Sequence, residues 1–331
     1  MKKLTLTAII LLGIIVIVHA KSWRVNNTPG VDADFTTLAA AQDSVAAGDT
    51  LYIEGSATSY GNFALTKKLI LIGPGYFLTE NDTTQATKQM AVLGDQVWIQ
   101  ASAAGSVISG LYCKGWILNK ANNVVITRNR VDDTSYGIGV AWDTETHDVV
   151  VSQNYCDEIS KNRSARDILI FNNIVKDRIQ MGTLYEHFTG VIKNNVVGNF
   201  IETANSEVTN NIIYNTNGGG YKISGQGNSY KYNLFAGTSV PSGTNNTANV
   251  DMNTVFADFT SKSVDNDFML KEGSPALGAG ENGTDCGAFG GDQPYVLSGI
   301  PGVPHIYEAI IPTSASSDSG LKVYLKIKTN N

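Results

Sequence analysis

Residues 125–131 read VITRNRV, and the same phrase returns five times along the chain: VVSQNYC at 150–156, LIFNNIV at 169–175, VIKNNVV at 191–197, EVTNNII at 207–213 and SYKYNLF at 229–235. An earlier, imperfect copy, VISGLYC, occupies 107–113. The second and seventh letters are apolar in every copy. A repeat of about 20 residues with one short β-branched run cannot bury its apolar face alone, so each copy must stack on the next. The pattern predicts a solenoid.

The fifth letter is asparagine in the six regular copies and Leu111 in the imperfect one; the column reads Asn129, Asn154, Asn173, Asn195, Asn211 and Asn233. Asparagine tolerates the left-handed backbone of a sharp corner, and its side-chain amide can bond the same amide one coil away. We therefore expect a ladder of stacked amides at the spacing of paired strands, about 4.8 Å.

A leucine-rich repeat is the rival architecture, because it also carries an internal asparagine column. Here Val and Ile dominate the repeat, and the spacing between successive column positions varies from 16 to 25 residues, which is too uneven for that fold. The predicted fold is an all-β, right-handed parallel β-helix.

The first 20 residues are typical of a secretory signal peptide, with Lys2 and Lys3, an apolar run and a small-residue cleavage site at Ala20. A membrane anchor is the alternative, but the run is short for a span. Loss of the two lysines changes the formal charge from −6 to −8, which disfavours nucleic acid as a partner. We expect a monomer without a membrane span that is secreted, periplasmic or on the cell surface.

The first and last coils of the predicted β-helix expose an apolar interior that other segments must cover. Phe35, Leu38, Ala41 and Val45 have the spacing of a short amphipathic helix that can cover the first coil. Residues 21–295 form the β-helix domain in this interpretation, and 296–331 form a C-terminal β-hairpin or tail that covers the far end or packs along a flank. A sorting element is the alternative for the tail.

Three stretches together carry a family resemblance: KLILIGPGYFL (68–78), the asparagine repeats, and DFMLKEGSPALGAGENGTDCGAFGG (267–291). The chain resembles exported right-handed β-helix repeat proteins of the pectate-lyase-like superfamily over about residues 22–295. The resemblance implies a polysaccharide ligand. The chain lacks the family's familiar catalytic phrases: Trp98-Ile99-Gln100 stands where pectate lyases often show WIDH, and of the polygalacturonase motifs only the Asp132-Asp133 pair is present.

Charged residues concentrate in the middle coils, just after the asparagine column. If register is preserved, Asp133, Glu158 and Asp177 stack about 4.8 Å apart. Three carboxylates so close repel one another and need a cation or basic neighbours. They are the predicted metal ligands, with Ca²⁺ as the candidate ion because it prefers hard oxygen donors.

Basic and aromatic side chains accompany these carboxylates. The predicted catalytic residues are Arg163, Arg178, Tyr185 and His187, and the predicted substrate-binding residues are Lys161, Arg166, Lys176 and Tyr155. An elimination reaction on a uronate needs its carboxylate neutralised and a base beside the acidic proton, which such residues can supply. The alternative is a surface of mutually satisfied ion pairs.

Two functions follow from these observations. The first is an exported protein that binds or processes polysaccharide, with a lyase acting on uronate-containing polymers favoured over a glycoside hydrolase if it is an enzyme. The second is a non-catalytic surface, adhesive or structural protein, whose outward-facing Tyr112, Tyr155 and Tyr232 stack on glycans or on a partner.

Overall fold

The computed structural model describes residues 20–182, 187–215, 226–314 and 320–329. Residues 1–19 of the predicted signal peptide and Tyr185 lie outside this part of the chain. No helix among the described residues is long and apolar enough to cross a membrane.

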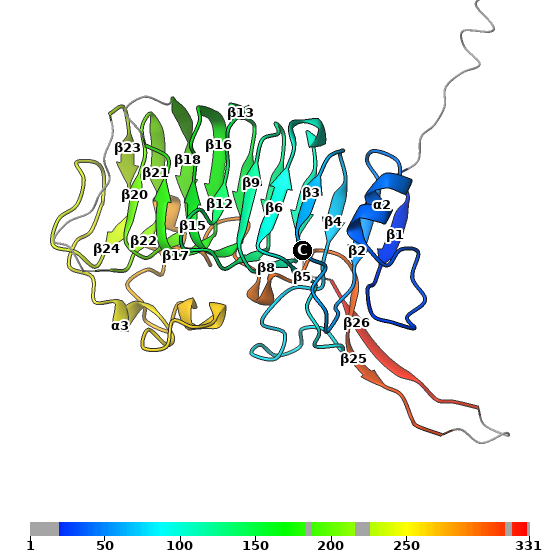
Figure 1. Cartoon of the computed structure of the whole chain (residues 1–331). Helices are drawn as coiled ribbons and strands as arrows, with labels where there is room; N and C mark the ends of the chain where they lie inside the picture. Colours follow the sequence, from blue (N-terminus) through cyan, green and yellow to red (C-terminus); the bar gives the residue numbers. More distant parts are fainter. Residues whose placement is uncertain (1–19, 183–186, 216–225, 315–319, 330–331) are drawn as a thin grey trace, which may run out of the picture.

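The chain winds into a parallel β-solenoid whose coils contribute strands to two long sheets (Figure 1). Neighbouring strands within both sheets pair in parallel, so the predicted parallel β-helix is confirmed. The first sheet contains β1 (Ser22–Val25), β2 (Thr50–Ile53), β4 (Ile70–Ile72), β7 (Val107–Ser109), β10 (Val125–Thr127), β14 (Val150–Ser152), β16 (Ala165–Phe171), β18 (Phe188–Lys193), β21 (Ser206–Thr209) and β23 (Ser229–Lys231), with β13 (Thr146–His147) beside β16.

The second sheet lies after the asparagine corner of each coil. Its strands are β3 (Phe63–Leu65), β6 (Gln96–Ile99), β9 (Trp116–Asn119), β12 (Ile138–Gly139), β15 (Tyr155–Ser160), β17 (Ile174–Gln180), β19 (Val196–Val197), β22 (Ile212–Ile213) and β24 (Leu234–Phe235), with the short strands β5 (Val92–Leu93), β8 (Tyr112–Cys113), β11 (Arg130–Val131) and β20 (Phe200–Glu202). Long β15 and β17 each pair with two short strands of a neighbouring coil.

The asparagine ladder is confirmed. Each column asparagine donates its backbone N–H and its side-chain Nδ2–H to Oδ1 of the next column asparagine, at 2.9–3.2 Å. The ladder also extends beyond the predicted column, because Leu111 N–H bonds Asn129 Oδ1 at 3.1 Å and Asn233 donates to Asn246. All six predicted members are fully buried, so each of these bonds satisfies polar groups that water cannot reach.

The predicted backbone role of the column is wrong by one position. The left-handed residues are those just before the asparagines, with φ between 52° and 59°: Arg128, Gln153, Asn172, Asn194, Asn210 and Tyr232. The corner is therefore made by the preceding residue, and the asparagine itself serves the amide ladder.

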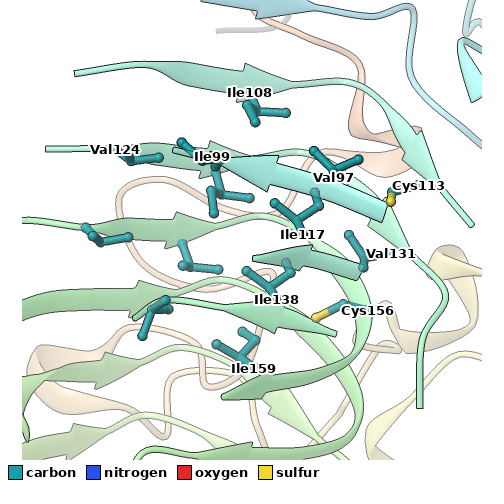
Figure 2. Close-up of a cluster of buried hydrophobic side chains, with 14 of the residues drawn as sticks. Val97, Ile99, Ile108, Cys113, Ile117, Val124, Val131, Ile138, Cys156 and Ile159 are labelled. Atoms are coloured by element: carbon teal, nitrogen blue, oxygen red, sulfur yellow. The ribbon is translucent and has the colours of Figure 1, made fainter. Parts of the chain in front are cut away.

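Inward-facing side chains of successive coils stack into one continuous core. Val97, Ile117, Ile138 and Ile159 form one such row (Figure 2). A second row places Val131 between Cys113 and Cys156, with the three residues in direct register. All three cysteines of the chain are buried and free.

A short helix covers the N-terminal coil, as predicted. Helix α2 (Leu38–Ser44) begins after Thr37, whose side chain accepts a hydrogen bond from Ala40 N–H at 3.2 Å. Leu38 and Ala41 are buried and pack into the same core as the strands. The helix thereby shields the apolar interior of the first coil from water.

The C-terminal segment 251–300 packs against the outside of the solenoid beside the asparagine corners and forms a second apolar core. It contains α3 (Met252–Val255) and three 3₁₀ turns, η2 (Asp265–Phe268), η3 (Glu281–Gly283) and η4 (Leu297–Gly299). Its side chains cover the position after the ladder column in the later coils, including Tyr155, Ile174 and Val196. This segment, rather than solvent, lies over that part of the outer surface.

A buried polar cluster fixes the C-terminal segment to the loop after β4. The Asp265 carboxylate accepts hydrogen bonds from Asn81 Nδ2 at 2.7 Å, Ser298 N–H at 2.6 Å and Tyr295 Oη at 3.1 Å. The Tyr295 and Tyr76 hydroxyls lie 2.6 Å apart. Burial raises the pKa of Asp265 above its ordinary value despite the three donors.

The predicted C-terminal hairpin is present: β25 (His305–Ile310) and β26 (Tyr324–Lys328) pair antiparallel. Its predicted position is wrong, because it projects away from the solenoid instead of covering an end or a flank (Figure 1). Its base is attached to the loop after β4, where Ala86 N–H donates to Ile306 O at 2.8 Å and Lys328 Nζ donates to Thr83 Oγ1 at 3.1 Å.

Candidate functional site

The outer face of the second sheet collects chemically active side chains from strands β6 to β20. The buried row Val97, Ile117, Ile138, Ile159, Ile179 and Ile201 faces the core, so the residues on either side of it face outward. One outward column contains Gln96, Trp116, Glu158, Arg178 and Phe200, and the other contains Trp98, Leu118, Gly139, Ser160, Gln180 and Glu202.

Aromatic rings dominate the part of this face over β6, β9 and β12. Trp98 and Trp116 meet edge to face with ring centroids 4.8 Å apart, and Lys120 Nζ lies 4.4 Å from the Trp98 ring centroid. Tyr136 and Trp142 form a second edge-to-face pair at 5.0 Å. We call Trp98, Trp116, Tyr136 and Trp142 the aromatic platform.

Gly139 provides the space that Trp142 occupies. A Cβ atom on Gly139 would lie 2.9 Å from Trp142 Cε3 and 2.5 Å from Leu118 Cδ2. The missing side chain in the outward column is thus replaced by an indole ring from the following turn. The arrangement requires a glycine at this position of β12, whose other residue is Ile138.

Ionised groups replace the rings over β15, β17 and β20. Arg178 Nη2 lies 2.7 Å from Glu158 Oε2, and its Nη1 lies 2.9 Å from Asp177 Oδ2. The Asp177 carboxylate also accepts a hydrogen bond from Asn199 Nδ2. Glu158 is only 2% exposed, and burial raises the pKa of its carboxyl although the Arg178 charge opposes that shift.

Two further pairs extend the charged part of the face. Gln180 Nε2 donates to Glu202 Oε2 at 3.1 Å on the next coil. On the neighbouring part of β15 and β17, Lys176 Nζ lies 2.8 Å from Asp157 Oδ1 and 5.4 Å from the Tyr155 ring centroid. Carboxylates and amides therefore continue along the sheet from the aromatic platform.

The predicted row of three carboxylates does not form. Strand register is broken between Cys156 and Glu158, so Glu158 pairs with Arg178 instead of Asp177. Asp133 caps its own turn by accepting backbone N–H bonds from Ser135 and Tyr136 at 2.9 and 2.7 Å. Among the residues that the structure describes, no group of three or more His, Cys, Asp or Glu side chains is placed to hold a metal ion.

Two of the tyrosines expected to face solvent do not offer a free ring. Tyr155 is 1% exposed, packs edge to face on Phe77 at 5.1 Å, and donates its hydroxyl to Ser263 O at 3.2 Å. Tyr112 is half-buried beneath the Arg130 guanidinium, which lies 4.5 Å from its ring centroid. The expectation failed because the C-terminal segment and the loop after β4 cover this corner.

The remaining predicted residues lie away from the Glu158–Arg178 pair, in the turns that lead back to the first sheet or on the first sheet itself. Arg163 is exposed and donates to the carbonyl of Asn162 at 2.7 Å, Arg166 is exposed on β16, and Lys161 is buried. His187 is exposed just before β18, and Tyr185 lies outside the described residues. The structure therefore brings Lys176 and Arg178 together with Glu158 and Asp177 and separates them from the other basic residues.

Sequence reasoning missed the aromatic platform and Glu202. The available signal was the position of three of the chain's four tryptophans, which all fall between residues 98 and 142. In the register of β6 and β9, Trp116 pairs with Gln96 and Trp98 pairs with Leu118, so the two indoles lie diagonally across consecutive coils.

The described residues also form grooves elsewhere. Two adjoining grooves of about 620 and 450 Å³ run along the outer face of the first sheet, share Phe171, Asp292 and Gln293, and are bordered by the C-terminal segment. A third, of about 680 Å³, lies between Tyr214 and the segment around α3. None of the predicted site residues lines these three grooves.

Comparison with known proteins adds little about activity. No protein-family model and no curated protein matches the sequence. Among solved structures, the crystal structure of the pectin methylesterase from Aspergillus niger in deglycosylated form matches with 12% sequence identity and a TM-score of 0.35, over 71% of this chain and 88% of that chain. At this identity and TM-score the match says nothing about substrate or chemistry, and the β-helix assignment rests on the observed strand pairing.

Proposed function

We propose that this protein binds a polysaccharide on the outer face of the second sheet. The observation that carries the proposal is the aromatic platform, in which four large rings lie on three successive coils. The Gln180 amide and the Glu202 carboxylate follow on the same sheet, two and three coils farther on. Sugar rings offer apolar C–H faces to aromatic side chains and hydroxyl groups to polar ones, so this combination suits them.

The coil spacing supports an extended ligand. Paired strands of a solenoid repeat every 4.8 Å or so, which is close to the length of one sugar unit in an extended glycan. A chain lying across β6 to β20 would meet aromatic side chains first and polar ones later. The same regularity supplies several weak contacts in series rather than one deep pocket.

The charges of the face favour a neutral polymer. Three of its cations each lie against a carboxylate of the same surface: Lys120 with Asp143 at 3.1 Å, Lys176 with Asp157, and Arg178 with both Glu158 and Asp177. A uronate would have to compete with these carboxylates and would meet the additional negative charge of Glu202.

Elimination on a uronate polymer is the second candidate, favoured by Arg178 and Lys176 on the face. A guanidinium has no acceptor for a proton, so an arginine that acts as a base must first lose a proton of its own. Arg178 would also have to leave Glu158 and Asp177, which lie 2.7 and 2.9 Å away. Binding without catalysis is therefore the version that the geometry supports best, and catalysis is an outcome of the test below.

Titration of the protein against soluble neutral glycans (β-glucans, xylans, mannans) and uronate polymers, by calorimetry, tests the proposal. We expect neutral glycans to bind, and Trp98→Ala and Trp116→Ala each to weaken binding roughly tenfold or more. Trp23→Ala, which removes a half-buried tryptophan of the first sheet, is the matched control and should leave affinity unchanged. Absence of binding across the panel refutes the proposal, and ultraviolet-absorbing products from uronates would establish the lyase instead.

A further inference from the structure

Within its paired strands, the projecting hairpin has one apolar face. Cross-strand pairs place Ile306 opposite Ile327 and Ala309 opposite Leu325 on this face. Ile311, Leu321 and Val323 lie just beyond the ends of these two strands and are also exposed. The six large residues are Ile306, Ile311, Leu321, Val323, Leu325 and Ile327, and they are 38–61% exposed.

The other face of the hairpin is mixed. It carries the pair Glu308–Lys326, whose charged atoms lie 2.6 Å apart, together with Lys328, Tyr324 and Ile310. Within the paired strands, the charged side chains thus lie on one side and none lies on the apolar face. An isolated two-stranded hairpin is at best marginally stable in water, so burial of this face would stabilise it.

The edges of the hairpin also differ. The outer edge of β25 is irregular, because its register shifts between Ile306 and Glu308, and its base is covered by the bond from Ala86. For β26, the structure describes no backbone hydrogen bond from residues 324–328 beyond those to β25. A regular strand with an open edge and an apolar face is an association surface.

We propose that this hairpin is a dimerisation element, whose apolar face packs on the same face of a second copy of the chain. The arrangement is isologous, since each copy offers and receives the same patch. Monomeric proteins rarely expose a contiguous apolar patch above a few hundred Å², and six large half-exposed side chains reach that size. Two such faces would bury on the order of 1,000 Å² in total, near the lower bound for a specific interface.

Charge selects a second copy over an anionic lipid surface. The apolar faces carry no charge, so bringing two together causes no direct repulsion, and Lys326 and Lys328 remain on the solvent side of each hairpin. The chain as a whole has a formal charge of −6, which opposes approach to an anionic membrane. The inference does not rest on the proposed glycan binding and replaces the earlier expectation of a monomer.

Sedimentation equilibrium of the chain from residue 21 onward tests the proposal. We expect a concentration-dependent dimer, and we expect Ile327→Lys to raise the dimer dissociation constant roughly hundredfold because the change enters the interface twice. Ile310→Lys is the matched control: Ile310 lies on the opposite face and is 56% exposed, against 61% for Ile327, so the dimer should persist.

Three results would overturn the proposal. The first is a monomer at every concentration, and the second is equal weakening of the dimer by both substitutions. The third is a monomer that co-floats with phosphatidylcholine–phosphatidylglycerol vesicles and loses this binding in Ile327→Lys. Leu325→Ser provides a second, milder change on the same face, and it should also raise the dissociation constant. Far-UV circular dichroism of each variant confirms that the solenoid is folded before its association is measured.

Discussion

Glu158 and Arg178 are joined twice, once as direct partners in the register of β15 and β17 and once through their side chains at 2.7 Å. The glutamate is almost fully buried, whereas the arginine reaches solvent on one side and also contacts Asp177. The pair sits where the aromatic part of the outer face changes to the charged part. Loss of the Glu158–Arg178 pair should therefore disturb the outer face at this boundary.

Arg178→Ala should destabilise the fold by about 2–3 kcal/mol, because it leaves Glu158 buried without its cation, with some of the loss offset by the solvent that reaches this site. Chemical denaturation at neutral pH measures the change. Burial already raises the pKa of Glu158 above its ordinary value of 4.5. The deficit should therefore shrink as the pH falls and the glutamate takes up a proton, and the double change with Glu158→Gln should largely remove it. A deficit independent of pH would contradict this account.

Asn173→Ala should be more costly than Asn246→Ala. Asn173 Oδ1 accepts from both the backbone N–H and the side-chain Nδ2 of Asn154. Its loss leaves the buried backbone N–H without an acceptor, at about 1–3 kcal/mol, whereas Nδ2 keeps its bonds to Ile126 O and Ser152 O. Asn246 accepts the same two bonds from Asn233 but is half-buried, so water can replace it. Thermal and urea unfolding of the two variants should rank them in this order. Equal losses of stability in the two variants would show that the buried bonds to Asn173 are worth no more than the half-buried bonds to Asn246.

The buried Asp265 predicts a pH dependence of stability. Burial raises its folded pKa above the ordinary 3.8, so the folded chain holds this proton at higher pH than the unfolded chain does. The unfolding free energy that Asp265 contributes should thus fall as pH rises from about 3.8 through the folded pKa, and then level off. The difference between wild type and Asp265→Asn, measured across this range, isolates the effect. An increase with pH would mean that the hydrogen bonds from Asn81, Ser298 and Tyr295 outweigh burial.

Gly139→Val should weaken glycan binding without touching a ligand. A Cβ atom at this position lies too close to Trp142 and Leu118, so the indole must move off the platform. Affinity for the best glycan of the panel should fall several-fold, and the tryptophan fluorescence should change. Gly237→Ala is the control, because its Cβ meets no atom within 4 Å. Unchanged affinity with a shifted emission spectrum would show that Trp142 is not part of the binding surface.

The architecture was predictable from sequence because the coils repeat the same local physics. The positions of Asn129 to Asn233 defined the ladder, and the apolar letters around them defined the core rows. The capping helix around Leu38 was also predictable, because its apolar spacing is a local signal, although Phe35 and Val45 of the predicted face lie outside the helix.

The site was less predictable because it depends on features outside the repeat. Counting residues from Asn154 and Asn173 placed Glu158 beside Asp177, but an irregularity after Cys156 brought it beside Arg178. Tyr155 faces outward as expected, yet Phe77 and the C-terminal segment cover it. Such covering segments bond to the solenoid over more than 100 residues of sequence, as in the contact of Tyr155 with Ser263, and no local pattern announces them.

The amide ladder has a direction: every rung gives its hydrogens to the following asparagine and receives those of the preceding one. If one whole coil were removed or duplicated, the asparagines on either side would still offer matching donors and acceptors to each other. The ladder alone therefore sets no number of coils, and the present length is tied instead to the C-terminal segment, which bonds to particular coils.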